Sequence, residues 1–136
     1  MMKRSGFLVV LLALLTLFAI SCSGGVSSTS IGGAEIQIGS EIKDDFYIVS
    51  PKTAFSVDED FYISFDNNAA FDSDFTTLKV EDTETQEIIA QIEYNVDPEW
   101  SVVITEMYSF QEPGKYKISF VVKEKVRASQ VVIVSE

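Results

Sequence analysis

Residues 112–122 read EPGKYKISFVV, and this stretch does most to decide the fold. Pro113 and Gly114 mark a turn, because proline fixes φ at the second turn position and glycine tolerates the positive φ that a type II turn requires at the third. From Tyr116 to Val122, apolar residues occupy every second position. A period of two residues is typical of a β-strand with one buried face. The stretch therefore predicts a turn followed by a strand.

Similar patterns recur from residue 34 onward, whereas no segment keeps a helical period of 3.6 residues over three turns. Phe61, Ile63 and Phe65, for example, share one face of a predicted strand. The run from Val131 to Val134 predicts a strand covered on both faces. The predicted strands lie at about 46–49, 53–57, 61–65, 75–81, 88–94, 100–105, 116–122 and 129–135. Their spacing of roughly 12 residues favours an all-β antiparallel sandwich of about seven to eight strands, with a closed barrel as the alternative.

The segment 110–118 resembles the turn that enters the penultimate strand of immunoglobulin-like and fibronectin-like sandwiches, where a Pro-Gly turn precedes a tyrosine at the sandwich corner. The matching positions here are Pro113, Gly114 and Tyr116. Immunoglobulin domains also carry a cysteine pair packed on a tryptophan. This chain lacks the pair, and Trp100 lies on a different predicted strand. The resemblance implies an immunoglobulin-like architecture for residues 34–136.

The first 21 residues have the pattern of an export signal. Lys3 and Arg4 precede a 14-residue apolar run, residues 7–20, that only Thr16 interrupts. A helix of this length spans about 21 Å, which is less than the roughly 30 Å hydrocarbon core of a membrane. The pattern therefore favours a cleaved signal peptide over a permanent membrane span.

The sequence Ala19-Ile20-Ser21-Cys22 resembles the bacterial lipobox, in which small residues precede a cysteine that receives diacylglycerol before cleavage. The resemblance implies that Cys22, the only cysteine, carries a lipid and begins the mature chain. Family members usually have Leu where this chain has Ala19. Ala19 and Ser21 also suit an ordinary secretory peptidase, which would leave Cys22 as a free thiol on a secreted protein.

Nine of the 11 residues 23–33 are Ser, Thr or Gly, a composition that predicts a flexible tether over residues 22–33. A tether suits a chain that is held at its start. By resemblance to the sorting of bacterial lipoproteins, Ser23 rather than Asp after the cysteine implies the outer membrane in a cell that has one.

Composition excludes several classes of function. The sequence has no histidine, so His-dependent general bases, Ser-His-Asp triads and Cys/His zinc sites are ruled out. Beyond residue 21 the chain has eight basic and 21 acidic residues, a net charge near −13, which disfavours binding to nucleic acid. No nucleophile motif or recognisable pair of catalytic carboxylates is present, so we expect no enzyme and no cofactor other than the covalent lipid.

Acidic and amide side chains crowd the predicted loop 66–74. Carboxylate and amide oxygens are the ligands that calcium prefers, and a loop at the end of a sandwich can supply them. The candidate ligands are Asp66, Asn68, Asp72 and Asp74. The spacing of a calcium-binding EF-hand loop is missing, so an ordinary solvated turn is the other interpretation.

Basic residues gather near the C-terminus. Residues 34–112 hold 19 acidic residues against three lysines, whereas residues 113–136 hold five basic residues against two acidic ones. The five are Lys115, Lys117, Lys123, Lys125 and Arg127. They form either a docking edge for an anionic partner or a set of charges that protects an edge strand from pairing, and we expect the second.

Together these observations predict a lipid-anchored bacterial envelope protein that displays an acidic β-sandwich. We expect it to bind an envelope protein or a glycan, or to serve as an accessory subunit of an envelope complex. A calcium-stabilised adhesive module and a secreted domain resembling a protease inhibitor are the alternatives.

Overall fold

The computed structural model describes residues 28–44 and 47–136, and these residues form strands without a helix. The signal peptide, the cleavage-site residues Ala19 and Ser21, and Cys22 lie outside the described residues. Eleven strands occur in the described part: β1 (Ser28–Ser30), β2 (Glu35–Gly39), β3 (Glu41–Lys43), β4 (Tyr47–Val49), β5 (Ala54–Ser56), β6 (Tyr62–Asp66), β7 (Phe75–Asp82), β8 (Ile88–Asn95), β9 (Val102–Ile104), β10 (Gly114–Val122) and β11 (Lys125–Ser135).

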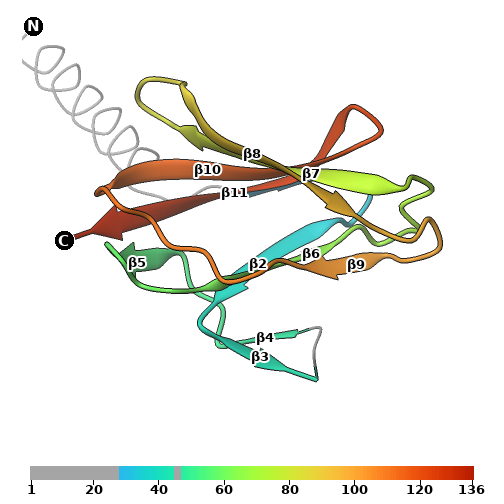
Figure 1. The fold of residues 1–136 in the computed structure, drawn as a ribbon, viewed down its shortest axis with the longest axis horizontal. Helices are drawn as coiled ribbons and strands as arrows, with labels where there is room; N and C mark the ends of the chain where they lie inside the picture. The colour runs from blue at the N-terminus through green and yellow to red at the C-terminus, as the bar shows by residue number, and fades with distance from the viewer. Residues whose placement is uncertain (1–27, 45–46) are drawn as a thin grey trace, which may run out of the picture.

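The strands form two facing layers (Figure 1). The larger sheet has the order β1-β11-β10-β7-β8, and β5 also pairs with β11. The smaller sheet has the order β2-β6-β9, and β3 and β4 form a separate hairpin. All pairs are antiparallel except β5 with β11.

This topology is that of an immunoglobulin-like sandwich. The order β2-β6-β9 corresponds to strands A, B and E of such domains, and β11-β10-β7-β8 corresponds to G, F, C and C′. From β6 onward, the chain crosses between the sheets from β6 to β7, from β8 to β9 and from β9 to β10. The prediction of an all-β immunoglobulin-like sandwich is therefore confirmed. The structure has more strands than the predicted seven or eight because several three-residue strands give too short a pattern to detect.

The core lies between the sheets and is rich in aromatic rings. Phe61, Ile63 and Phe65 are fully buried, as their shared face predicts. The rings of Phe65 and Phe120, one from each sheet, stack with centroids 4.5 Å apart and planes 6° apart. Such a pair contributes about 0.5–1.5 kcal/mol beyond the burial of its area, so it helps to hold the two sheets together.

Tyr116 occupies the sandwich corner. Its hydroxyl donates a hydrogen bond of 2.8 Å to the carbonyl of Glu112, and its ring stacks on Phe110 with a centroid distance of 4.2 Å. This is the tyrosine corner of immunoglobulin-like domains. Gly114 does not adopt the predicted type II turn. Its φ of 158° is nearly extended, because β10 already begins there and pairs with β11.

Two predicted strands differ in detail. Trp100 lies in the loop before β9, where its backbone N–H donates to the carbonyl of Asp97, and the residue is 55% exposed. The turn after Pro98 interrupts the alternation that seemed to begin at Trp100. In β11, Val131, Val132 and Val134 are buried, but Ile133 is exposed, so the strand is not covered along its whole outer face.

The predicted tether is structured at its C-terminal end. Residues 28–30 form β1, which pairs with β11, and the N–H of Ile31 donates to the carbonyl of Arg127. Gly33 has a φ of 80°, and a Cβ built on it would lie 2.6 Å from Nδ2 of Asn68. The described part of the sandwich therefore starts before the predicted boundary at residue 34. The composition of this segment predicts flexibility, but in the structure Gly32 and Gly33 form a tight turn.

The tyrosine corner yields a stability prediction. Replacing Tyr116 by Phe removes the hydroxyl group that donates a hydrogen bond to the carbonyl of Glu112. We expect the free energy of unfolding to fall by about 1 kcal/mol. Denaturant titration of the full chain measures this change. The matched control is Tyr62→Phe, because the Tyr62 hydroxyl has no hydrogen bond to another described residue. Equal effects of the two substitutions would contradict the assigned role of the corner.

Candidate functional site

Two of the predicted basic residues lie on the outer face of the larger sheet, which is the face turned away from β2, β6 and β9. They lie on a central strand and not at an edge. Lys115 and Lys117 lie on this face of β10, opposite the buried Tyr116 and Ile118. Strand β10 pairs with β11 on one side and with β7 on the other. It is a central strand, so the interpretation that these lysines protect a sheet edge is wrong.

Apolar side chains accompany the lysines on this face. Phe75 of β7 and Ile88 of β8 are 42% and 46% exposed, and Val126 of β11 is also exposed. Together with neighbouring polar residues they line a shallow groove of about 760 Å³. Its lining residues are Ser73, Phe75, Thr77, Lys79, Ile88, Gln91, Val121, Lys123, Glu124 and Val126. Exposed apolar residues gathered in a groove with a polar rim are typical of an interaction surface.

The charges around the groove are partly paired. Lys79 lies opposite Gln91 on β8 and forms an ion pair of 2.9 Å with Glu81 on its own strand. Lys123 pairs with Asp72, and its hydrogen bond holds the pKa of that carboxyl below the usual range. Lys115 and Lys117 form no ion pair with another described residue. The face therefore offers two lysines without such an ion pair, although Glu81 of β7 lies opposite Lys117 on the same face.

Arg127 belongs to the predicted basic group but has a structural role. Its Nε donates to Oδ1 of Asn67 at 2.8 Å, and its Nη2 donates to the carbonyl of Asn67 at 3.2 Å. Lys123 and Lys125 flank the turn between β10 and β11. Of the five basic residues, two therefore lie on the sheet face, two lie at the turn, and Arg127 binds the loop after β6.

Three connections meet at the end of the sandwich beside the groove: β6 to β7, β8 to β9 and β10 to β11 (Figure 1). The N–H of Phe71 donates to the carbonyl of Trp100 at 2.7 Å, and the N–H of Asp72 donates to the carbonyl of Pro98 at 2.9 Å. These bonds present the exposed Trp100 side chain on a fixed loop. Tryptophan is enriched among residues that dominate binding energies, so Trp100 is a candidate residue for contact with a partner. The sequence did not indicate this role, because it placed Trp100 on a predicted strand.

The four candidate calcium ligands do not gather. The carboxylate of Asp66 accepts the N–H of Asn68 at 2.8 Å, and Nδ2 of Asn68 donates to the carbonyl of Gly32 at 3.0 Å. Asp72 pairs with Lys123. Asp74 accepts the N–H of Val96 through its backbone carbonyl. Within residues 28–44 and 47–136, no group of three acidic side chains lies close enough to hold a metal ion. Of the two interpretations of this loop, these contacts favour the solvated turn.

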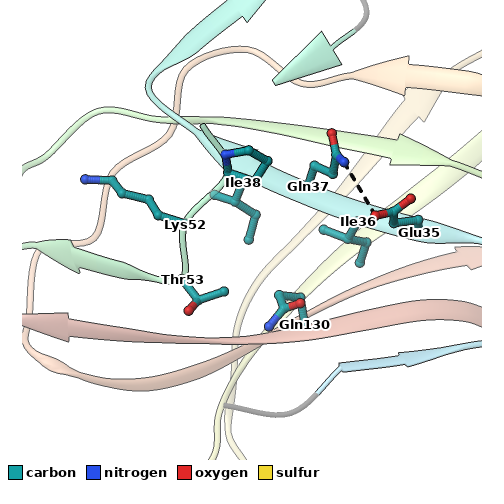
Figure 2. A pocket seen from close by; sticks show the side chains of 8 residues that line it. Glu35, Ile36, Gln37, Ile38, Lys52, Thr53 and Gln130 are labelled. Carbon is teal, nitrogen blue, oxygen red and sulfur yellow. Dashed lines mark hydrogen bonds between the residues drawn. The ribbon is translucent and has the colours of Figure 1, made fainter. Parts of the chain in front are cut away.

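A second cleft, of about 360 Å³, opens between β2 and β11 at the side of the sandwich (Figure 2). Ile36 and Ile38 contribute apolar side chains from β2, and Gln130 reaches toward them from β11. Nε2 of Gln130 donates to the carbonyl of Val131 at 3.0 Å, and the N–H of Lys52 donates to the carbonyl of Ile38 at 2.8 Å. The polar groups at this cleft thus serve the sandwich itself.

Comparisons with known proteins add little to these observations. No protein-family model and no curated protein matches the chain. Among solved structures, the soluble domain of PmoD from Methylocystis is similar, with a TM-score of 0.45, 11% identity, and coverage of 75% of this chain and 90% of that one.

A CARDB domain from Pyrococcus furiosus, solved in complex with di-metal ions, has a TM-score of 0.39, 11% identity, and coverage of 79% and 98%. Both TM-scores are below 0.5, so neither structure bears on the ligands of this chain. None of the described residues forms a helix capable of spanning a bilayer.

The geometry of the loop predicts the response to calcium. Because Asp66, Asn68 and Asp72 already have partners, we expect millimolar calcium to leave the melting temperature unchanged. Differential scanning calorimetry of the full chain with and without calcium measures this. A stabilising shift that disappears in Asp72→Ala but persists in a control, Glu99→Ala, would contradict the expectation and establish a calcium site.

Proposed function

We propose that this protein is a non-catalytic lipoprotein of the bacterial cell envelope that binds a protein partner through the groove on the outer face of its larger sheet. The observation that carries the proposal is the placement of Lys115, Lys117 and Phe75 on central strands. Neither core packing nor edge protection requires lysines or an exposed phenylalanine there.

The residues of the groove fit a partner with an apolar contact and an acidic rim. Phe75, Ile88 and Val126 supply surface that a partner could remove from water, at about 25 cal/mol for each Å² of apolar area. Lys115 and Lys117 do not line the groove but lie on the same sheet face, farther along β10 than Val121, and would meet carboxylates of the partner. The acidic remainder of the domain would repel other acidic surfaces and so favour one orientation of docking.

The expected absence of catalysis is supported by the composition of the sequence. The chain has no histidine, and Cys22 is its only cysteine. The hydrogen bond from Lys52 lowers the pKa of Glu59, as that from Lys123 lowers the pKa of Asp72. A carboxyl group that acts as a general acid near neutral pH needs a raised pKa, so these two groups are unsuited to that role.

The proposed lipid anchor at Cys22 is supported by the resemblance to the lipobox. It would also limit how far the domain can lie from the membrane. If Cys22 carries the lipid, six Cα-to-Cα steps separate it from Ser28, the first residue of β1. Six steps span at most about 20 Å even when the chain is fully extended. The domain would therefore stay close to the membrane surface, which is the outer membrane by resemblance, and would bind partners within the envelope.

The anchor can be tested directly. Mass spectrometry of the full-length protein from native membranes should find an N-terminal peptide that begins at Cys22 and carries a lipid. Cys22→Ser should lose this peptide and no longer partition into a detergent phase. An unmodified N-terminus in the unchanged chain would instead establish a secreted protein.

The groove can be tested by affinity capture from cross-linked native membranes. We expect Lys117→Glu and Phe75→Ser each to reduce the recovery of the main partner at least fivefold, because they remove charge complementarity and apolar contact. Lys43→Glu, which makes the same charge change on the distant β3, should leave recovery unchanged. Equal losses in Lys117→Glu and Lys43→Glu would contradict the groove as the binding surface.

A further inference from the structure

The turn between β10 and β11 adopts a backbone conformation that its residues disfavour. Val122 pairs with Lys125, so only Lys123 and Glu124 connect the two strands (Figure 1). Their φ angles are 50° and 65°, which are the positive values of a type I′ turn. Such turns favour Asn-Gly or Gly-Gly, because the Cβ atom of most other residues crowds the backbone at positive φ. Lysine and glutamate therefore strain this turn.

Elsewhere the chain meets the same requirement with glycine. Gly32 and Gly33, in the turn between β1 and β2, have φ angles of 64° and 80°. Glycine at both positions avoids the strain that a Cβ atom would cause. The presence of Lys123 and Glu124 between β10 and β11 therefore implies a role for their side chains that offsets the strain.

Contacts within the described part of the domain do not supply that role. Both residues are exposed, so neither contributes to the core. Lys123 pairs with Asp72, but the two side chains are 52% and 79% exposed, and ion pairs in water contribute little to stability. The Glu124 side chain forms no hydrogen bond or ion pair with another described residue.

We infer that Lys123 and Glu124 are contact residues for the protein partner of the groove, an inference that rests on the proposed function. Both residues line the groove together with Phe75 and Val126. The partner presents a carboxylate to Lys123 and a lysine to Glu124, next to the apolar group that enters the groove. The short turn holds the two opposite charges in place before binding, which reduces the entropy lost on association.

Zero-length cross-linking tests the contacts directly. A carbodiimide joins an amine to a carboxylate that touches it and adds no spacer. Applied to native membranes that contain the full chain, it should link Glu124 to a lysine of the partner and Lys123 to an aspartate or glutamate of the partner. Mass spectrometry of the captured complex identifies the linked residues. Links of Lys123 to Asp72 alone, with the partner joined elsewhere, or links of Lys123 and Glu124 to a second copy of this chain would overturn the inference.

Replacing the strained turn separates binding from stability. Lys123→Asn combined with Glu124→Gly introduces the turn sequence that a type I′ turn prefers, so the melting temperature should rise by at least about 4 °C. The same double variant should reduce recovery of the partner at least fivefold, because both contacts are lost. Calorimetry and affinity capture of the full chain measure the two effects. Unchanged recovery, or no gain in melting temperature, would contradict the inference.

Two control variants exclude indirect effects. Ser50→Gly relieves a φ of 52° in the connection between β4 and β5, away from the groove, and should raise the melting temperature without changing recovery. Lys125→Asn removes a charge from the same hairpin at a position that does not line the groove, and should also leave recovery unchanged. A loss in either control as large as in the double variant would overturn the inference. If Phe75→Ser reduces recovery and the double variant does not, only the role of the turn fails, whereas unchanged recovery in both contradicts the groove itself.

Discussion

Every strand at the edge of a β-sheet leaves a row of N–H and C=O groups without partners, and the way this chain treats its edges governs the rest of the structure. The outer edge of β11 is closed by two short strands, β1 in its first half and β5 in its second. Strand β10 is central because it pairs with β11 on one side and with β7 on the other, and its outer face carries Lys115 and Lys117. The lysines on that face are then available for binding, and β8 remains as the long open edge.

One polar residue, Asn67, holds the loop after β6 to β11 at the end of the sandwich. Asn67 is almost fully buried and accepts from Arg127, donates through Nδ2 to the carbonyl of Ala69, and donates its backbone N–H to Ser101. No buried side-chain nitrogen or oxygen of the described residues lacks a partner. Such a fully satisfied group fixes the loop after β6 against β11, and the neighbouring Asn68 holds the same loop to the carbonyl of Gly32.

Sequence reasoning succeeded where a local pattern and the tertiary fold agree. The alternation around Phe61, Ile63 and Phe65 correctly predicted a buried face. The Pro-Gly pair before Tyr116 correctly predicted the sandwich corner, although not the type II turn. Both signals are local. They depend on residues within a few positions of each other, which is the range over which strand periodicity and turn chemistry act.

The errors arise where distant segments decide the outcome. The sequence around Lys115 cannot show that β7 lies beside β10, so Lys115 and Lys117 were interpreted as residues that protect a sheet edge. Ser28 to Ser30 read as tether because their strand pairing depends on β11, about 100 residues away. In the same way, the sequence of the loop 66–74 cannot show that Lys123 and Gly32, both distant in sequence, contact two of the four candidate calcium ligands.

Residue-resolved amide hydrogen exchange of the full chain tests the assignment of closed edges most directly. The N–H groups of Ile31, Val57 and Ile133 each donate across the edge of β11, to Arg127, Ser135 and Thr53 respectively. We predict that these three amides exchange much more slowly than in an unstructured peptide of the same sequence. Exchange at the unstructured rate at Ile31 and Ile133 would contradict the account, because β11 would then be an open edge and the sandwich would begin where the composition of the tether ends.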